Sequence, residues 1–235
     1  NNTNATVMDY EGFTAQAFSQ KKIAYDGSTV VEIHYRRNSY PVKWVVDGVT
    51  NTVQVKYGAI ITRPDNPTNP GFVFDRWNGF AENTIMGTSE RTFTAVWKSA
   101  TDTPYTVKHI RADLNGNYPA EGNFVETEAR YGITGTQTAA APKYYPGFTA
   151  NSVTQEIIEP DGTTEVTIKY DRNQYTVTWM VYNNNTYAIT DENFGKPITI
   201  PEGTPEMNGY TFKQWLHIPD EMPANPVCIM AEFTP

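Results

Sequence analysis

Apolar and polar residues alternate along several short stretches of this chain. In one of them Val166, Ile168 and Tyr170 are apolar, and Thr167 and Lys169 stand between them. Successive side chains of a strand point to opposite faces of a sheet, so this pattern predicts a strand with one face on a core and the other in water. The stretch that follows, "YTVTWMV" at residues 175–181, has the same period.

Turn signals separate these strand-like runs. Asp-Gly occurs at Asp26-Gly27 and again at Asp161-Gly162, and Asn-Gly occurs at Asn115-Gly116. Glycine accepts a positive φ without steric strain, so each pair predicts a turn. Long helical periodicity is absent, and the pattern as a whole predicts a mainly β chain.

The motif Tyr-x-Arg-Asn-x-Tyr-x-Val-x-Trp occurs twice, at residues 35–44 and 170–179, with an offset of 135 residues. The match continues backwards at this offset, and "GFTA" at residues 12–15 returns at residues 147–150. The inward positions of the two copies agree, whereas outward positions such as His34 and its counterpart Lys169 differ, as expected where a core tolerates less change than a surface.

The repeat divides the chain into two kinds of module, which we call module A and module B. The predicted ranges are the C-terminal half of a module A (1–38), a first module B (39–98), a polar linker (99–104), a complete module A (105–173) and a second module B (174–235). No residues are left over at the A-to-B junctions, so we expect adjacent modules to hold a defined angle. The half module lacks strands, and we expect its open edge to be covered by a neighbour, a swapped partner or a completing segment.

Module B resembles the Listeria–Bacteroides repeat, also called the internalin B-repeat. The resemblance rests on a Tyr-x-Val-x-Trp opening, a Gly before a Pro-rich turn, Gly-x-x-Phe-x-x-Trp and a closing Ala-x-aromatic. These positions are Tyr40, Val42, Trp44, Gly58, Gly71, Phe74, Trp77, Ala95 and Trp97 in the first copy, and Tyr175, Val177, Trp179, Gly195, Gly209, Phe212, Trp215, Ala231 and Phe233 in the second.

Module A resembles the mucin-binding-protein-like (MucBP-like) repeats that alternate with such modules in bacterial surface proteins. The stretches "YTVKHIRADLNG", "YGITGT", "YYPGFT" and "VTIKYDRN" carry this resemblance. Together the two resemblances imply small α+β, β-grasp-like modules in an elongated tandem array. They imply an extracellular protein of the bacterial cell surface, anchored outside this fragment, and no catalysis.

The charge and composition exclude several classes of partner. The formal net charge is −8 and basic residues form no cluster, which argues against nucleic acid or an anionic membrane surface. No apolar run is long enough for membrane insertion. A single cysteine, Cys228, excludes an internal disulfide and a cysteine-based zinc site, and its apolar surroundings predict a buried side chain.

No catalytic, cofactor-binding or metal-binding residue is predicted. His34, His109 and His217 lie in different modules without metal-ligand spacing, and His34 is expected to be solvated. The segment that begins at Asp113 alternates oxygen-bearing side chains as a calcium loop does. It lacks the glycine and the glutamate that such a loop has at its sixth and twelfth positions, so it predicts a turn.

Aromatic residues are the remaining candidates for binding. The tryptophans recur at equivalent positions of both B modules or are replaced by phenylalanine, which indicates core residues. Tyr118, Tyr144 and Tyr145 fall near turns and are the residues we nominate for ligand contact.

The sequence therefore favours a non-catalytic stalk or spacer that presents a distal adhesive domain, with the neighbouring modules of the same chain as its partners. One alternative is that the modules themselves bind a host or dietary glycan, such as mucin or a polysaccharide, or a surface protein, which predicts exposed aromatics clustered on one face. A second alternative is a set of accessory modules of a secreted glycosidase.

Overall fold

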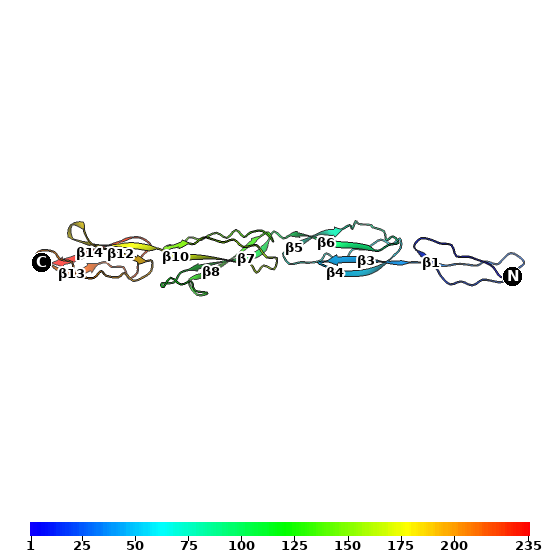
Figure 1. Cartoon of the computed structure of the whole chain (residues 1–235), viewed down its shortest axis with the longest axis horizontal. Coiled ribbons are helices and arrows are strands. Elements are labelled where there is room, and N and C mark those ends of the chain that lie inside the picture. Colours follow the sequence, from blue (N-terminus) through cyan, green and yellow to red (C-terminus); the bar gives the residue numbers. More distant parts are fainter. The chain divides into compact units, whose positions relative to one another are not determined.

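The computed structural model describes residues 1–235, apart from the side chain of residue 183. The chain divides into two compact units, Asn1–Ser99 and Ala100–Pro235. Strands make up nearly all of the regular structure and form separate small sheets (Figure 1). The prediction of a mainly β chain is confirmed. The α+β description is not supported, because the only helix in the described residues is the 3-10 turn η1 (Tyr182–Asn184). No helix among the described residues is long and apolar enough to cross a membrane.

In the first unit, the first module B forms a four-stranded sheet in the order β4–β3–β6–β5. The strands are β3 (Ser39–Val46), β4 (Val49–Lys56), β5 (Phe72–Asn78) and β6 (Arg91–Ser99). The two central strands, β3 and β6, run parallel, and each edge strand is antiparallel to its neighbour. Asp47 and Gly48 both have positive φ and close the β3–β4 hairpin, as a two-residue turn requires.

The second module B repeats this arrangement in the second unit, with the order β12–β11–β14–β13. Its strands are β11 (Gln174–Val181), β12 (Asn185–Asn193), β13 (Thr211–Leu216) and β14 (Val227–Thr234). The central strands β11 and β14 are again parallel.

Module A forms the other four-stranded sheet of the second unit, in the order β8–β7–β10–β9. Its strands are β7 (Thr103–Arg111), β8 (Val125–Gly132), β9 (Phe148–Ala150) and β10 (Glu165–Arg172). Strands β7 and β10 are parallel, and the short β9 pairs with the end of β10. The half module at residues 1–38 has only β1 (Phe13–Ala15) and β2 (Tyr35–Arg37), which correspond to β9 and the end of β10.

The alternation of apolar and polar residues in the sequence matches the alternation of buried and exposed side chains in the structure. On β10 the side chains of Val166, Ile168 and Tyr170 are buried, and Thr167 and Lys169 are exposed. The tryptophans behave as core residues: Trp44, Trp77 and Trp179 are buried, and the other two are partly buried.

A β-bulge explains why Phe and Trp stand three residues apart in the Gly-x-x-Phe-x-x-Trp motif. The pairing of β5 with β6 shifts register between Phe74 and Arg76, and that of β13 with β14 shifts between Phe212 and Gln214. In a regular strand, residues three apart face opposite sides. The extra residue of the bulge reverses the faces to which the following side chains point. Phe74 and Trp77 therefore pack on the same core.

The predicted Asp-Gly turns are present in both copies. The carboxylate of Asp26 accepts hydrogen bonds from the backbone and hydroxyl of Ser28, and that of Asp161 does the same for Thr163. Asp113 likewise accepts from the backbone N–H groups of Asn115 and Asn117, each at 2.8 Å, which confirms a turn there.

The half module keeps the local structure of module A but not its core. Ile158 is 2% exposed in module A, and its counterpart Ile23 is 51% exposed. Ile33 is only partly buried, whereas its counterpart Ile168 is completely buried. In module A the burial is completed by β7. No described residue takes that place beside residues 30–34, so the expected cover of the open edge is not found within this chain.

The prediction that Cys228 is buried is wrong. Cys228 lies on β14 with its thiol exposed, between partly buried Val227 and fully buried Ile229. The run "PVCIMAEF" belongs to a strand with one wet face, so every second residue points to solvent whatever its polarity.

Candidate functional sites

The junction from module A to the second module B is organised by Arg172, at the end of β10. Its Nε donates to the carbonyl oxygens of Ala112 and Asp113, at 3.0 and 2.9 Å, and its Nη1 donates to that of Phe194 at 2.6 Å. The guanidinium also lies 5.0 Å from the ring centre of Phe148. Arginine suits this place because its planar group can stack on a ring while its N–H groups reach several carbonyls.

The junction from the half module to the first module B has the same construction. Nη1 of Arg37 donates to the carbonyl oxygen of Tyr57 at 3.1 Å, and its guanidinium lies 5.6 Å from the ring centre of Phe13. The backbone N–H of Tyr57 donates to the carbonyl of Asn38, as that of Phe194 does to Asn173.

A glycine lets an aromatic ring of module B approach each junction closely. A Cβ on Gly12 would lie 2.2 Å from the ring of Tyr57, and one on Gly147 would lie 2.3 Å from the ring of Phe194. Both glycines also have a positive φ. The "GFTA" repeat therefore supplies two parts of each junction, the glycine that admits the ring and the phenylalanine that the arginine covers.

The structure does not bring the three nominated tyrosines together as an exposed platform. Tyr144 is 87% exposed. Tyr145 is partly buried, packs against the core of module A and donates a 2.6 Å hydrogen bond to Glu126. Tyr118 is also partly buried, and its hydroxyl bonds to Asp171 and Asn151. Of the three, only Tyr144 presents its side chain freely.

Beside Tyr145 lies a network of charged groups. Nζ of Lys143 sits 2.6 Å from a carboxylate oxygen of Glu126 and 3.0 Å from one of Glu128. The hydrogen bond from Lys143 is the main reason that the pKa of Glu128 falls to about 2, and the same bonds raise the pKa of Lys143. Burial, followed by the bond to Glu126, raises the pKa of Tyr145 to about 12. A lysine held in its charged form is not a nucleophile.

His109 is fully buried behind this network, which the sequence did not reveal. Its Nδ1 lies 2.7 Å from the hydroxyl of Tyr170, and burial lowers its pKa. The sequence pattern could have indicated this burial. His109 stands two residues after Val107 and four after Tyr105 on β7, so the three side chains point to the same, buried face. His34 is exposed, as predicted. In the part of the chain that the structure describes, no group of three or more His, Cys, Asp or Glu residues could hold a metal ion.

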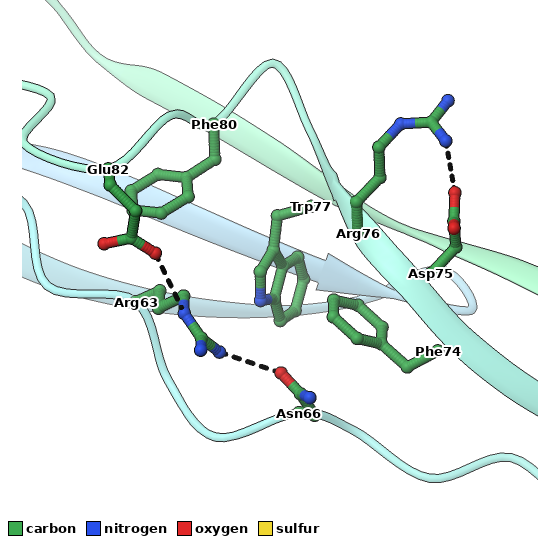
Figure 2. A pocket seen from close by; sticks show the side chains of 8 residues that line it. All are labelled: Arg63, Asn66, Phe74, Asp75, Arg76, Trp77, Phe80 and Glu82. Atoms are coloured by element: carbon green, nitrogen blue, oxygen red, sulfur yellow. Dashed lines mark hydrogen bonds and ion pairs between the residues drawn. The ribbon is translucent and has the colours of Figure 1, made fainter.

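The first module B carries a pocket of about 310 Å³ beside the bulge of β5 (Figure 2). Its lining consists of three aromatic residues and five polar or charged ones: Phe74, Trp77 and Phe80, with Arg63, Asn66, Asp75, Arg76 and Glu82. The ring of Trp77 lies at the centre of the view, with its nitrogen on the side of Arg63 and its six-membered ring toward Phe74. Residue patterns had predicted Trp77 only as a core residue.

The polar groups of the pocket form pairs of opposite charge. Nε of Arg63 lies 3.3 Å from Oε1 of Glu82, and Nη1 of Arg63 donates to the amide oxygen of Asn66 at 2.8 Å. Arg76 pairs with Asp75, whose second oxygen lies 2.6 Å from Nζ of Lys98. Within the described part of the chain, Nε1 of Trp77 is buried and has no hydrogen-bond partner.

Both B modules resemble one known family. The model of the Listeria-Bacteroides repeat domain matches residues 40–103 and 175–221, which together make up a little under half of the chain. This supports the resemblance that the Tyr-x-Val-x-Trp and Gly-x-x-Phe-x-x-Trp motifs carried. A comparison with curated proteins finds no match.

Solved structures that align with the chain include bacterial repeat proteins. A structure described as Mub-RV is 18% identical, covers 58% of this chain and 99% of its own, and has a TM-score of 0.19. Domains 3–4 of Streptococcal High Identity Repeats in Tandem (SHIRT), from a cell surface protein, are 14% identical, cover 58% of this chain and 98% of their own, with a TM-score of 0.22. The Bacillus anthracis TIE protein is 10% identical, covers 94% of this chain and 58% of its own, with a TM-score of 0.29. TM-scores this low carry no argument about function.

Proposed function

We propose that this chain is a non-catalytic repeat segment of a bacterial cell-surface protein, and that it acts as a spacer which presents a distal adhesive domain. The resemblance of both B modules to the Listeria-Bacteroides repeat supports the surface location.

The observation that carries the spacer role is the repeated junction. A spacer must resist bending where its modules meet. At each A-to-B junction the strand of one module runs into the next with only Asn38 or Asn173 between them. An arginine, Arg37 or Arg172, then bonds across to a backbone carbonyl of the next module. Such charge-assisted bonds, combined with packing on a ring, hold one geometry better than a flexible linker does.

We also propose bounds and a fold type for the modules. We take their bounds to be 1–38, 39–98, 105–173 and 174–235, with 99–104 as the connecting segment. The sheet order, with two parallel central strands between antiparallel edge strands, supports a β-grasp-like sheet that lacks a covering helix. Module A is then a MucBP-like repeat alternating with internalin-type B-repeats.

The spacer role is tested by the stiffness of the second junction. Cys228 is first changed to Ser, and spin labels are attached through Tyr131→Cys on β8 and Tyr210→Cys beside β13, two exposed positions in the two modules of the second unit. Pulsed electron–electron double resonance spectroscopy then measures the distribution of the distance between the two labels. A narrow distribution is expected, and it should broaden when Arg172→Met removes the bonds across the junction.

A broad distribution in the parent chain would contradict the spacer role, because the junction would then be a hinge. The binding alternative is tested separately, with the purified chain, mucin and a panel of polysaccharides. Tyr144→Ala is the informative variant there, because Tyr145→Ala would also remove the bond to Glu126 and disturb the core.

A further inference from the structure

We propose that the pocket of the first module B, between Arg63, Trp77 and Glu82, is a binding site for one unit of a neutral saccharide. This goes beyond the spacer role, because it gives one module a ligand of its own. The site rests on three features of the pocket: an unused hydrogen-bond donor, a balanced set of charges, and aromatic surface at its edge.

The unused donor is the indole N–H of Trp77. The side chain is 5% exposed, and within the described residues nothing accepts a hydrogen bond from Nε1. A buried donor without a partner destabilises the folded chain, so native structures rarely leave one. Nε1 lies on the side of the ring that faces Arg63 and the pocket (Figure 2). An acceptor oxygen brought by a ligand would satisfy it.

The charges of the pocket select an uncharged ligand. Its two arginines are balanced by Asp75 and Glu82, and both arginines are already paired. An anion would be repelled by Asp75 and Glu82, and a cation would be repelled by Arg63 and Arg76, so neither gains a net attraction from the lining. A hydroxyl group both donates and accepts, so it can join these pairs without breaking them.

The aromatic residues and the size favour a sugar among neutral polar ligands. Phe74 and Phe80 are partly buried, so part of each ring is left for a ligand. Small-ligand sites combine such apolar surface with a few placed polar groups, and their volumes begin at about 300 Å³. At about 310 Å³ the pocket holds a small unit and not an extended chain. A sugar ring has both C–H faces for the aromatic rings and hydroxyls for the polar groups.

Arg63, on whose side Nε1 of Trp77 lies (Figure 2), is the side chain that we expect to move when a ligand oxygen reaches the indole. Its side chain is 44% exposed and its partner Glu82 is 76% exposed. An exposed ion pair contributes little to stability, so the two side chains can shift together at little cost.

The second module B lacks the counterparts of Arg63 and Asn66 and is a control within the same chain. Trp215 replaces Trp77, while Ile200 and Gly203 stand where the first module has Arg63 and Asn66. A sugar that bound tryptophan-bearing modules in general would affect both. A sugar that needs this pocket affects Trp77 alone.

The test is nuclear magnetic resonance of the full ¹⁵N-labelled chain, observing the indole N–H signals. Trp77→Phe identifies the signal of Trp77, and Trp215→Phe identifies the internal control. The probes are glucose, galactose, mannose, fucose, N-acetylglucosamine and N-acetylgalactosamine, with glucuronate and N-acetylneuraminate as charged sugars, each up to about 50 mM, a range that detects millimolar binding.

We expect at least one neutral sugar to shift the Trp77 signal in a saturable way while the Trp215 signal stays in place. The double variant Arg63→Ile/Asn66→Gly copies the second module on exposed loop positions. It should weaken that binding at least about tenfold, as expected when hydrogen bonds worth about 1.4 kcal/mol are lost.

Three results would overturn the proposal. The first is that no neutral sugar moves the Trp77 signal, and the second is that the Trp215 signal moves with the same affinity. The third is that only the charged sugars bind, which would make the site an anion site. A dispersed signal of Trp44 verifies that the first module B is folded in its variants, and a dispersed signal of Trp179 does so for Trp215→Phe.

Discussion

Nη1 of Arg172 and the carbonyl oxygen of Phe194 lie 2.6 Å apart, and this hydrogen bond joins the last strand of module A to the module B that follows. The same guanidinium lies near three phenylalanine rings, so it cannot leave without exposing them. One side chain therefore combines polar and packing contributions at the junction.

Replacement of Arg172 by methionine should destabilise the second junction. The variant keeps an apolar side chain on the rings but leaves the carbonyls of Ala112, Asp113 and Phe194 without their donor. We expect a loss of about 2 kcal/mol, the contribution of hydrogen bonds to a charged group. Urea unfolding followed through the amide signals of Ile168 and Val177 measures it. Arg91→Met, at an exposed position of β6, is the control. It should leave the unfolding free energy read from both amide signals unchanged.

Alanine at Gly147 should destabilise the chain more than alanine at Gly116. Both glycines have positive φ, +80° and +83°, so both variants suffer the same backbone strain of about 1–2 kcal/mol. Only at Gly147 would the new Cβ also meet a ring, that of Phe194, at 2.3 Å. Overpacking adds about 1–3 kcal/mol. Equal losses in the two variants, measured by urea unfolding, would show that the ring can move aside freely.

Acid should weaken module A between about pH 4.5 and pH 2. The pKa of Glu128 is lowered from 4.5 to about 2 in the folded chain, so the unfolded chain binds its proton first as the pH falls. Stability is therefore present above pH 4.5 and lost toward pH 2. The expected contribution is about 2 kcal/mol, less than the full shift implies, because solvent screens a partly exposed pair.

Urea unfolding at several pH values, read from the amide of Ile168, tests this expectation. Glu128→Gln should flatten the pH profile over this range, whereas Glu156→Gln, at an exposed position of the same module, should leave it unchanged. A profile in which both variants keep the acid-sensitive step would assign it to other carboxylates.

A peptide of residues 103–134 should bind the half module at residues 1–38. In module A these residues form β7 and β8, and β7 runs parallel to β10 along Glu165–Tyr170. The half module presents the corresponding open edge and exposed Ile23. Methyl signals of Ile23 and Ile33 should shift when the peptide is added to the full chain.

The matched control is the same peptide with Val107→Lys, because Val107 is completely buried in module A. If neither peptide shifts the signals of Ile23 and Ile33, the exposed face of the half module does not require strands of this type, and the open-edge argument fails.

Much of the sheet structure could be read from the chain because it depends on local rules. The burial of Val166, Ile168 and Tyr170 follows from a two-residue period, and agreement between the two copies of the repeat distinguishes core positions from surface positions. Cys228 shows the limit of this reasoning. Its neighbours are apolar, and only the pairing of β14 decides that its side chain belongs to the wet face.

The nominated tyrosines show a second limit. Tyr144 and Tyr145 are adjacent in sequence and equally aromatic, yet one is exposed and the other packs on Tyr170 with ring centres 4.9 Å apart. The partner that buries Tyr145 comes from a strand 25 residues further along the chain. A local pattern carries no information about such a distant contact.

By itself the sequence determined the mainly β character, the internal repeat and many of the core positions. These follow from periodicity and from residue identity, which are local properties. Only the tertiary structure decided that Arg37 and Arg172 bond across the junctions, that His109 is buried, and that the polar groups of a pocket surround an indole N–H without a partner. Each of these features depends on groups from separate strands and loops. Only folding of the backbone brings such groups within bonding distance.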